Sequence, residues 1–335
     1  MRVLLAIVVL LALGWSGWWW WNATSRQSGV ESWLADRRAD GWVAEAGDIA
    51  VTGFPNRVDL KITDLELTNP EPAWSWMAEE FEILSLSYKP HHVIAVWPGE
   101  QIVASPYERV LVESALMRGS LVFEPNPSLT LDRTTIEIDD MMLKGETGWE
   151  ARLGEALFAV RQSESETADH AYDLNFNADL IVPPRGWLSA VERSGVLPET
   201  IETARIDATV VFDRPLDRQS VEGDAPGVEE VRLRDASITW GELDLRGQGT
   251  LRSDADGYLE GKIDVRARNW REMIDLAEAA GALPDGIGGA LRAGLDLLAL
   301  ISGSGDSLTA PLVFEDGRVK LGPVVIGDAP RLGIR

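Results

Sequence analysis

Residues that could ligate a metal or act as a nucleophile are scarce in this chain, which has three histidines and no cysteine. His91 and His92 are adjacent, and adjacent side chains of a strand point to opposite faces, so the pair is not expected to clamp one ion. His170 ends an acidic stretch and is typical of a loop. The lack of cysteine excludes disulfides, thiolate nucleophiles, iron–sulfur clusters and cysteine-ligated zinc. We therefore predict no metal site.

Sequence patterns for catalysis or for cofactor binding are also missing. The chain has no G-x-S-x-G between a strand and a helix, no G-x-G-x-x-G and no Walker-type lysine loop. Asp139-Asp140 offers a carboxylate pair, but 54 acidic residues make any such pair uninformative. Asp254-x-Asp256-Gly257 resembles a calcium loop, yet Val265 stands where the closing glutamate would be, which favours a turn. We predict no catalytic residue and no cofactor, and we do not expect an enzyme.

The N-terminal segment carries the clearest signal, because Val3 to Trp21 contains 19 residues without a charge. At about 1.5 Å per residue a helix of this length spans roughly 28 Å, close to the ~30 Å thickness of the hydrocarbon core. We predict a transmembrane anchor over residues 1–22. The alternative is a cleaved signal peptide, but no A-x-A site follows the apolar run. The residues expected at the membrane interface are Trp15, Trp18, Trp19, Trp20 and Trp21.

Charge bears on orientation and on partners. Arg2 precedes the apolar run, whereas Arg26, Arg37 and Arg38 follow it, so the positive-inside rule alone favours the opposite orientation slightly. A short basic tail before an apolar run is typical of export, so we expect a single-pass inner-membrane protein with its C-terminal domain in the periplasm. Acidic residues exceed basic ones by 54 − 31 = 23, which argues against nucleic acid as a partner and against broad contact with anionic lipid.

Most of the remaining chain has the period-two pattern of strands. Residues 24–40 have helical spacing and predict a juxtamembrane helix. Residues 42–161 form a predicted N-terminal β-rich region, with a bulge where the apolar parity changes after Ile62. The fold class we expect is mainly β (α+β), with extended or curved antiparallel sheets and a few short helices after one transmembrane helix. The strands predicted between residues 81 and 161 are 81–88, 92–97, 109–114, 119–124, 129–138, 141–147 and 149–161.

The C-terminal region, residues 171–335, contains an apparent internal repeat. Residues 172–201 and 258–287 each begin with a tyrosine, continue to a tryptophan and a helix, and end in G-x-L-P-[DE]-x-I. Such a helix stop is also a generic pattern, so a chance match is the alternative. A true repeat predicts that Trp187 and Trp270 are both buried near the start of helices within 184–196 and 270–301. Two further turns, Asp256-Gly257 and Asp316-Gly317, predict β-hairpins.

Three segments of the sequence carry a resemblance to a known family. They are Gly53-Phe54-Pro55-Asn56-Arg57-Val58-Asp59, Leu86-Ser87-Tyr88-Lys89-Pro90-His91-His92-Val93-Ile94-Ala95-Val96 with Pro98 and Gln101, and the tail from Pro311 to Pro323. These segments resemble an uncharacterised alphaproteobacterial family, the domain-of-unknown-function family 2125. The tail, with its strand, Asp-Gly turn and strand, is also loosely similar to AsmA-like envelope proteins. The resemblance implies a membrane-anchored envelope protein without known enzymatic activity, and it supplies no catalytic residues.

Two functional hypotheses follow. The first is an anchored binding protein whose apolar sheet face, over the strands in 56–124, holds lipid or another amphiphile, as AsmA-like relatives are thought to do. The sequence leaves the lipid-binding residues and any protein partner unknown. The second is a structural scaffold that presents an acidic surface to an envelope partner. The deciding question is whether helices within 184–196 and 270–301 cover the apolar face or leave it open.

Overall fold

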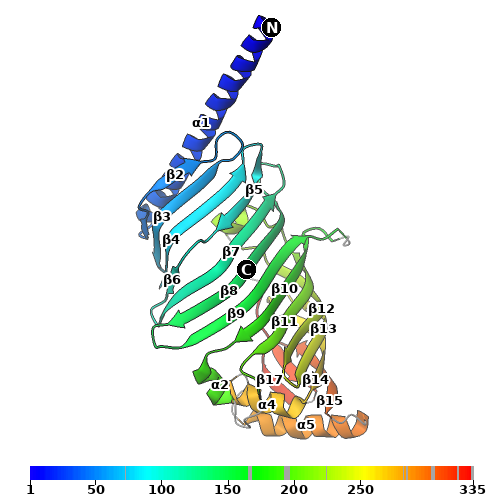
Figure 1. Cartoon of the computed structure of the whole chain (residues 1–335). Helices are drawn as coiled ribbons and strands as arrows, with labels where there is room; N and C mark the ends of the chain where they lie inside the picture. Colours follow the sequence, from blue (N-terminus) through cyan, green and yellow to red (C-terminus); the bar gives the residue numbers. More distant parts are fainter. Residues whose placement is uncertain are drawn as a thin grey trace. The chain divides into compact units, whose positions relative to one another are not determined.

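The computed structural model describes residues 1–332 except 72, 165–167, 192–196, 224, 282, 284–285, 303–305 and 323. It contains two compact units (Figure 1), one formed by Met1–Val122 with Ile136–Gly148 and the other by Phe123–Thr135 with Trp149–Arg335. Both are built from antiparallel strands, which confirms the predicted mainly β class. The second unit includes residues 149–161, which the sequence pattern assigned to the N-terminal region. The reason is that strand β9 (Glu150–Gln162) pairs along nearly its whole length with β10 (Ala171–Val182).

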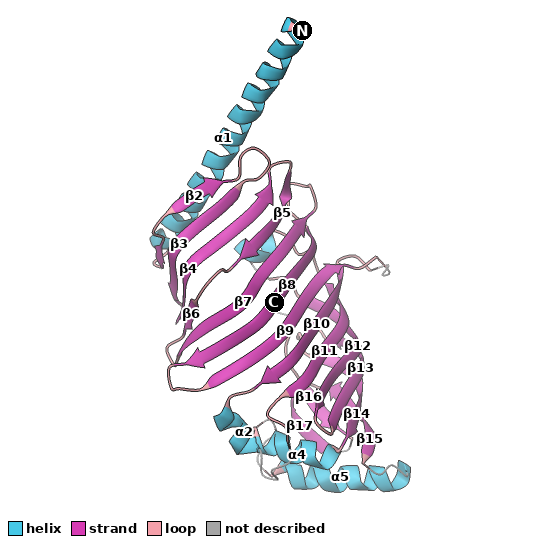
Figure 2. Ribbon diagram, viewed as in Figure 1, coloured by secondary structure: helices cyan, strands magenta, loops and turns pink. Residues whose placement is uncertain are grey.

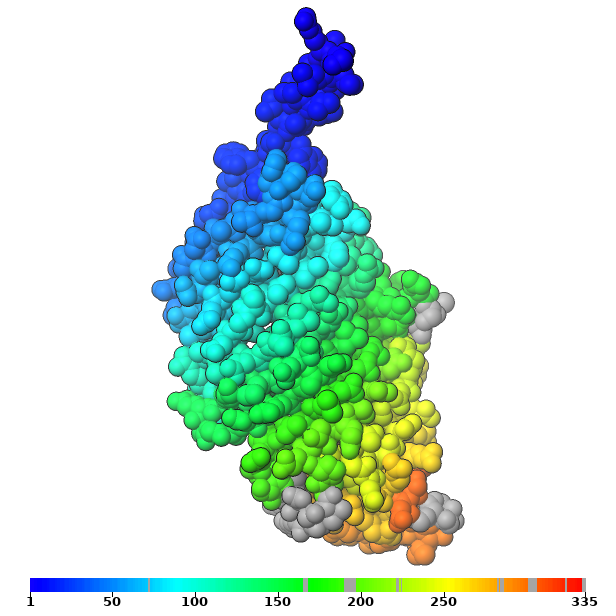
Figure 3. Space-filling model, viewed as in Figure 1, coloured from blue at the N-terminus to red at the C-terminus, as the bar shows by residue number. Residues whose placement is uncertain are grey.

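The first unit begins with one uninterrupted helix, α1 (Arg2–Ala39, 38 residues), so the predicted anchor and juxtamembrane helix are continuous. By length and composition α1 is a helix that could cross a membrane, and its apolar window is not buried against the rest of the chain. In Figure 3 the start of α1, in dark blue, projects from the rest of the first unit. Its C-terminal half behaves differently, since Leu34 is only 2% exposed.

The strands of the first unit pair mostly as neighbours in sequence. β3 lies between β4 and the two short strands β1 and β2, β4 pairs with β5 and β6, and both of these pair with β7. Asp64 of β3 has a positive φ of 49° and is skipped in the pairing with β4. Leu60 and Ile62 before it and Leu65 and Leu67 after it are therefore all buried despite their change of parity. The bounds are β1 Val43–Glu45, β2 Ile49–Thr52, β3 Asp59–Pro70, β4 Ala73–Leu86, β5 Lys89–Val96, β6 Gln101–Ala104, β7 Arg109–Phe123 and β8 Leu131–Gly145.

Two pairs of predicted strands are single long strands in the structure. Ranges 109–114 and 119–124 belong to β7, and ranges 129–138 and 141–147 belong to β8. The sequence suggested breaks because Gly119 and Asp139-Asp140 are residue types that commonly separate strands. In β8, Asp140 has a positive φ of 46°, which alters the direction of the side chains without ending the strand.

The second unit is a meander in which each strand from β9 to β17 pairs antiparallel with the next. The Asp316-Gly317 hairpin turn is confirmed, and both residues have positive φ, 52° and 69°. Asp254-x-Asp256-Gly257 also forms a turn, because Asp254 Oδ1 accepts hydrogen bonds from the backbone N–H groups of Asp256 and Tyr258. The remaining bounds are β11 Ile201–Phe212, β12 Val228–Trp240, β13 Leu243–Ser253, β14 Leu259–Arg268, β15 Ser307–Glu315, β16 Arg318–Leu321 and β17 Val324–Asp328.

Three helices, α2 (Arg185–Val191), α4 (Trp270–Ala279) and α5 (Ile287–Ser302), lie at one end of the strands of the second unit (Figure 2). The predicted helix over 270–301 is two helices, because α4 ends before Gly281, whose φ is 70°. A four-residue helix, α3 (Gln219–Glu222), precedes β12. The predicted helix over 184–196 is observed as α2, and residues 192–196 lie outside the described part of the chain, as do several positions of the G-x-L-P elements.

A strand followed by a helix occurs at both proposed repeats, but the two tryptophans differ. Trp270 is 2% exposed and packs with Ile274 and Leu291, whereas Trp187 is 38% exposed and stacks on Trp240. The prediction that both are buried is therefore wrong for Trp187. In α2 the buried residue is Leu188, which packs against Trp240 in a separate cluster. The reason is a different helix phase, since α2 presents the residue after its tryptophan to the core.

Candidate functional site

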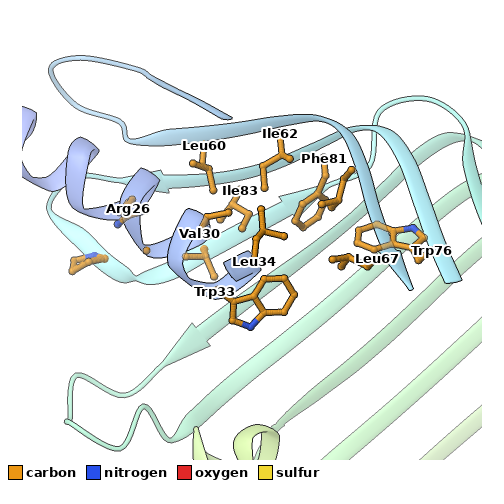
Figure 4. A pocket seen from close by; sticks show the side chains of 14 residues that line it. Arg26, Val30, Trp33, Leu34, Leu60, Ile62, Leu67, Trp76, Phe81 and Ile83 are labelled. Atoms are coloured by element: carbon orange, nitrogen blue, oxygen red, sulfur yellow. The ribbon is translucent and has the colours of Figure 1, made fainter. Parts of the chain in front are cut away.

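An apolar pocket lies between the C-terminal half of α1 and the strands β3, β4 and β5 (Figure 4). Its volume is about 490 Å³. The only charged side chain among the lining residues is that of Arg26, and the others are apolar apart from Gly29. The lining residues are Arg26, Gly29, Val30, Trp33 and Leu34 of α1, Leu60, Ile62, Leu65 and Leu67 of β3, Trp76, Phe81 and Ile83 of β4, and Pro90 and Val93 of β5.

Two periodicities of the sequence produce this pocket. On the sheet side, alternate residues of β3 and β4 pair across the strands, with Ile62 opposite Phe81 and Leu67 opposite Trp76. On the helix side, the lining positions fall three, four, seven and eight residues after Arg26, which places them on one face of α1. Gly29 adds open space, because a Cβ at this position would have no atom within 4 Å. The helix thus forms one wall of the pocket without filling it.

Arg26 is a half-buried cation at the border of this pocket. Its Nε donates to Asn22 Oδ1 at 3.0 Å and its Nη1 donates to Ser85 Oγ at 2.5 Å, while Ser85 Oγ donates onward to the Val58 carbonyl. Burial lowers the pKa of the Arg26 guanidinium, and the nearby Asp59 carboxylate opposes this effect. Neither hydrogen bond uses Nη2. The fixed guanidinium can therefore donate to a carboxylate or phosphate oxygen.

The five tryptophans predicted at the membrane interface all lie on α1, but they have two kinds of surroundings. Trp18, Trp20 and Trp21 are 38%, 68% and 63% exposed. Trp15 and Trp19 instead donate their indole N–H groups to backbone carbonyls of the β2–β3 loop. The sequence offered no sign of these contacts, since the partners are 40 and 38 residues away.

The second unit contains a separate apolar surface, one face of the strands β9–β15. Cross-strand partners form an unbroken apolar row across seven strands, and neighbouring rows have the same character. The helices cover only one end of this face, and Ile206, in the middle of the row, is 39% exposed. The row consists of Phe158, Phe176, Ile206, Ala236, Gly247, Val265 and Ala310.

The opposite face of these strands is charged and holds an ion-pair network. Arg234 contacts Asp173 at 3.2 Å and Asp207 at 2.6 Å, and Thr209, which is 1% exposed, donates to Asp173. Burial alone would raise the pKa of Asp173, but the hydrogen bonds from Thr209 and Arg234 together outweigh it and lower the pKa. This network gives the sheet a polar side.

Three other titratable side chains, those of His92, Glu80 and Glu82, lie on strands and contact side chains of the same or a neighbouring strand. His92 Nε2 lies 3.0 Å from Ser120 Oγ on the neighbouring strand β7. Glu80 and Glu82 lie on one face of β4, where the hydrogen bond from Lys61 lowers the pKa of Glu80, and burial and then Glu80 raise that of Glu82. Within the described ranges, no three His, Asp or Glu side chains gather in a way that could hold a metal ion.

Comparison with known proteins places the chain in a family. No curated protein and no solved structure matches the chain. One family model does match it, over residues 19–330, and this range includes all the residues that line the pocket, the strands β1 to β17 and the last three residues of the apolar run, Trp19 to Trp21. Because the match covers most of the 335 residues, the chain belongs to DUF2125, a family described as uncharacterized proteins conserved in bacteria.

Proposed function

We propose that this protein is a membrane-anchored binding protein that holds an acyl chain of an anionic amphiphile in the pocket between α1 and β3–β5, without chemistry on it. The observation that carries the proposal is the pocket itself, an apolar space of about 490 Å³ with one guanidinium at its border. This volume falls within the range of roughly 300–1,000 Å³ that is typical of small-molecule sites. We further propose that α1 spans the inner membrane and that the β-rich units lie in the periplasm.

The pocket suits the hydrocarbon part of such a ligand. Each methylene transferred from water into an apolar site contributes roughly 0.8 kcal/mol. Part of this gain is offset by the loss of translational and conformational freedom on binding. Val30, Trp33 and Phe81 offer aliphatic and aromatic walls with no hydrogen-bonding group other than the indole N–H, so an apolar chain is favoured over a polar ligand.

Arg26 suits the head of the ligand. It is held by Asn22 and Ser85 and is placed where the pocket borders the polar surroundings. A carboxylate or phosphate there would gain a charge-assisted hydrogen bond, which is roughly twice as strong as a neutral one. The chain carries a formal charge of −23, so this guanidinium is a local exception that favours an anion at one defined place.

The position of the pocket on α1 supports a supply of ligand from the membrane. Arg26 follows the last residue of the tryptophan belt, Trp21, by five residues, which is roughly 7.5 Å along a helix. The pocket therefore begins within about 10 Å of the belt that marks the expected interface. An amphiphile could move from the bilayer to the pocket without crossing much water.

The proposal can be tested on the full-length protein in nanodiscs with a C16 fatty acid that carries a photoactivatable diazirine near its terminal methyl group. Mass spectrometry should find saturable cross-links to residues 26–34 and 60–93, and unlabelled fatty acid should compete with them. The Arg26→Gln variant should lose the preference for the acid over its methyl ester but retain binding of the ester. Arg38→Gln, the same change on the exposed side of α1, is the control and should retain the preference.

One result would reject the binding function. In that result the cross-links are confined to the apolar run of α1, and none of them saturates in the pocket. That result would leave the second hypothesis, a scaffold that presents the acidic surface to an envelope partner. The partly exposed apolar face around Ile206 would then be the first surface to examine for a protein contact.

A further inference from the structure

The β2–β3 loop, residues 53–58, lies directly on the apolar run of α1. Trp15 Nε1 donates to the Pro55 carbonyl at 3.0 Å, and Trp19 Nε1 donates to the Arg57 carbonyl at 2.6 Å. The ring of Phe54 packs edge-on against that of Trp19, with centroids 5.4 Å apart. A loop of the β-rich part is therefore fixed to the segment of α1 that is expected to lie in the bilayer.

The depth of this contact follows from the length of the helix. A hydrocarbon core of about 30 Å needs about 20 helical residues, so a span that starts at Arg2 ends near Trp21. Trp19 and Trp15 then lie about 3 Å and 9 Å below that end, measured along the helix. Because the loop is hydrogen-bonded to both indoles, it lies at the same depth, in the outer part of the hydrocarbon core next to the interfacial layer.

Most backbone carbonyls of the loop accept hydrogen bonds from within the protein, which suits surroundings poor in water. The Gly53 carbonyl accepts from the Arg57 N–H at 2.8 Å, and the Asn56 carbonyl accepts from Ser87 N–H and Ser87 Oγ, both at 2.9 Å. With the two indole bonds, the carbonyls of residues 53, 55, 56 and 57 all have donors within the protein. Unsatisfied backbone groups are very costly in lipid, so these four hydrogen-bonded carbonyls lower the cost of bringing the loop to the interface.

The side chains of this region match the same surroundings. Phe54 is 55% exposed, and Tyr88, in the β4–β5 turn joined to the loop through Ser87, is 60% exposed. Exposed aromatic side chains are a feature of membrane interfaces, where the ring lies among the acyl chains and a polar tip reaches the headgroups. The charge of Arg57 is paired with Asp59 at 2.8 Å. The loop and the turn are two of the segments that the family resemblance rested on.

We propose that the β2–β3 loop and the β4–β5 turn form a second membrane contact, with Phe54 and Tyr88 inserted into the interfacial layer of the bilayer that α1 crosses. This inference does not depend on the proposed acyl-binding function. It depends on α1 crossing a membrane, which its length and composition allow. The contact fixes the pocket at the lipid surface and prevents α1 from acting as a loose tether.

The absence of cysteine makes the test direct, because one introduced cysteine is the only label site. Phe54→Cys and Tyr88→Cys variants of the full-length protein carry an environment-sensitive NBD fluorophore in vesicles of phosphatidylethanolamine and phosphatidylglycerol. Tyr107→Cys is the matched control, because Tyr107 is 94% exposed and lies in the β6–β7 turn, where Ala104 pairs with Ser75 near the other end of β4. Tyr88→Cys leaves the Phe54–Trp19 contact intact, so it tests insertion even if the label at position 54 displaces the loop.

The expected result is a blue-shifted emission at positions 54 and 88, quenched several-fold more strongly by nitroxide-labelled lipid than at 107. Aqueous iodide should show the reverse order. Labels at 54 and 88 that iodide reaches as readily as the label at 107 would overturn the proposal. Loss of fatty-acid cross-linking with intact insertion would instead reject only the acyl-binding function, so the two failures are distinguishable.

Discussion

Filling the pocket from Gly29 separates ligand binding from folding. Gly29 lines the pocket, has ordinary helical geometry, and has no atom within 4 Å of the position that a Cβ would occupy. A Cβ at position 29 therefore meets no clash, and the rest of a Gly29→Leu side chain is expected to extend into the pocket that Gly29 lines. The substitution also removes a glycine from the middle of a helix, which favours the helix by roughly 0.8 kcal/mol.

Gly29→Leu is expected to weaken ligand binding and to stabilise the folded protein. The four carbons of the new side chain displace about four methylenes of an acyl ligand, and at roughly 0.8 kcal/mol each the loss is about 3 kcal/mol. This corresponds to a rise of more than about a hundredfold in the dissociation constant. Partial burial of the leucine in the pocket adds stability, so the folded state should gain about 1–2 kcal/mol.

The assay measures both quantities on the same sample. Competition of the photoactivatable fatty acid by unlabelled ligand gives the affinity, and thermal unfolding of the reconstituted protein gives the stability. Gly289→Leu, the same change at an exposed position of α5 with no atom near its Cβ, is the matched control and should leave affinity unchanged. Undiminished affinity in Gly29→Leu together with a raised melting temperature would refute the reasoning, because the ligand would then not occupy this pocket.

Three further predictions concern the folded units. Leu34→Ala, which removes the most buried side chain of α1 from its cluster, should destabilise the first unit by about 2–5 kcal/mol in denaturant titrations. Trp270→Ala should cost the second unit about 3–5 kcal/mol, whereas Trp187→Ala should cost clearly less, and equal losses would contradict their different burial. The lowered pKa of Asp173 means that its contribution is present above the unfolded pKa of about 3.9 and is lost as pH falls through the folded value, so Asp173→Asn should weaken the acid dependence of the melting temperature.

Local sequence signals predicted the elements of this fold well. The uncharged run predicted α1, the Asp316-Gly317 turn predicted its hairpin, and the change of apolar parity after Ile62 predicted the irregularity at Asp64. Each of these depends on residues within one or two turns of chain, where sterics and periodicity decide the conformation. Strand limits were less predictable, because β7 continues through Gly119 and β8 through Asp139-Asp140.

The candidate site depends on contacts that no local pattern contains. The apolar faces of α1 and of β3 were both visible in the sequence, but not that they lie against each other with a space beside Gly29. The roles of Arg26 and of the loop at Phe54 also arise only from packing, since Arg26 contacts Ser85, 59 residues away. The segments around Trp187 and Trp270 also show that packing decides burial. Their sequence patterns are similar, but Trp270 is buried and Trp187 is exposed once the helices pack.

Truncating α1 would affect the pocket as well as the anchor, because one helix forms both. α1 provides the expected membrane span and, without a break, one wall of the pocket from Arg26 to Leu34. A soluble fragment that begins at or after residue 26 removes the Trp15 and Trp19 contacts to the β2–β3 loop and leaves a short, frayed helix over the pocket. Such a fragment would retain the strands of both units but would show weak ligand binding even if the intact protein binds tightly. Binding has therefore to be measured on the full chain in a bilayer, where the span, the loop and the pocket wall are in place together.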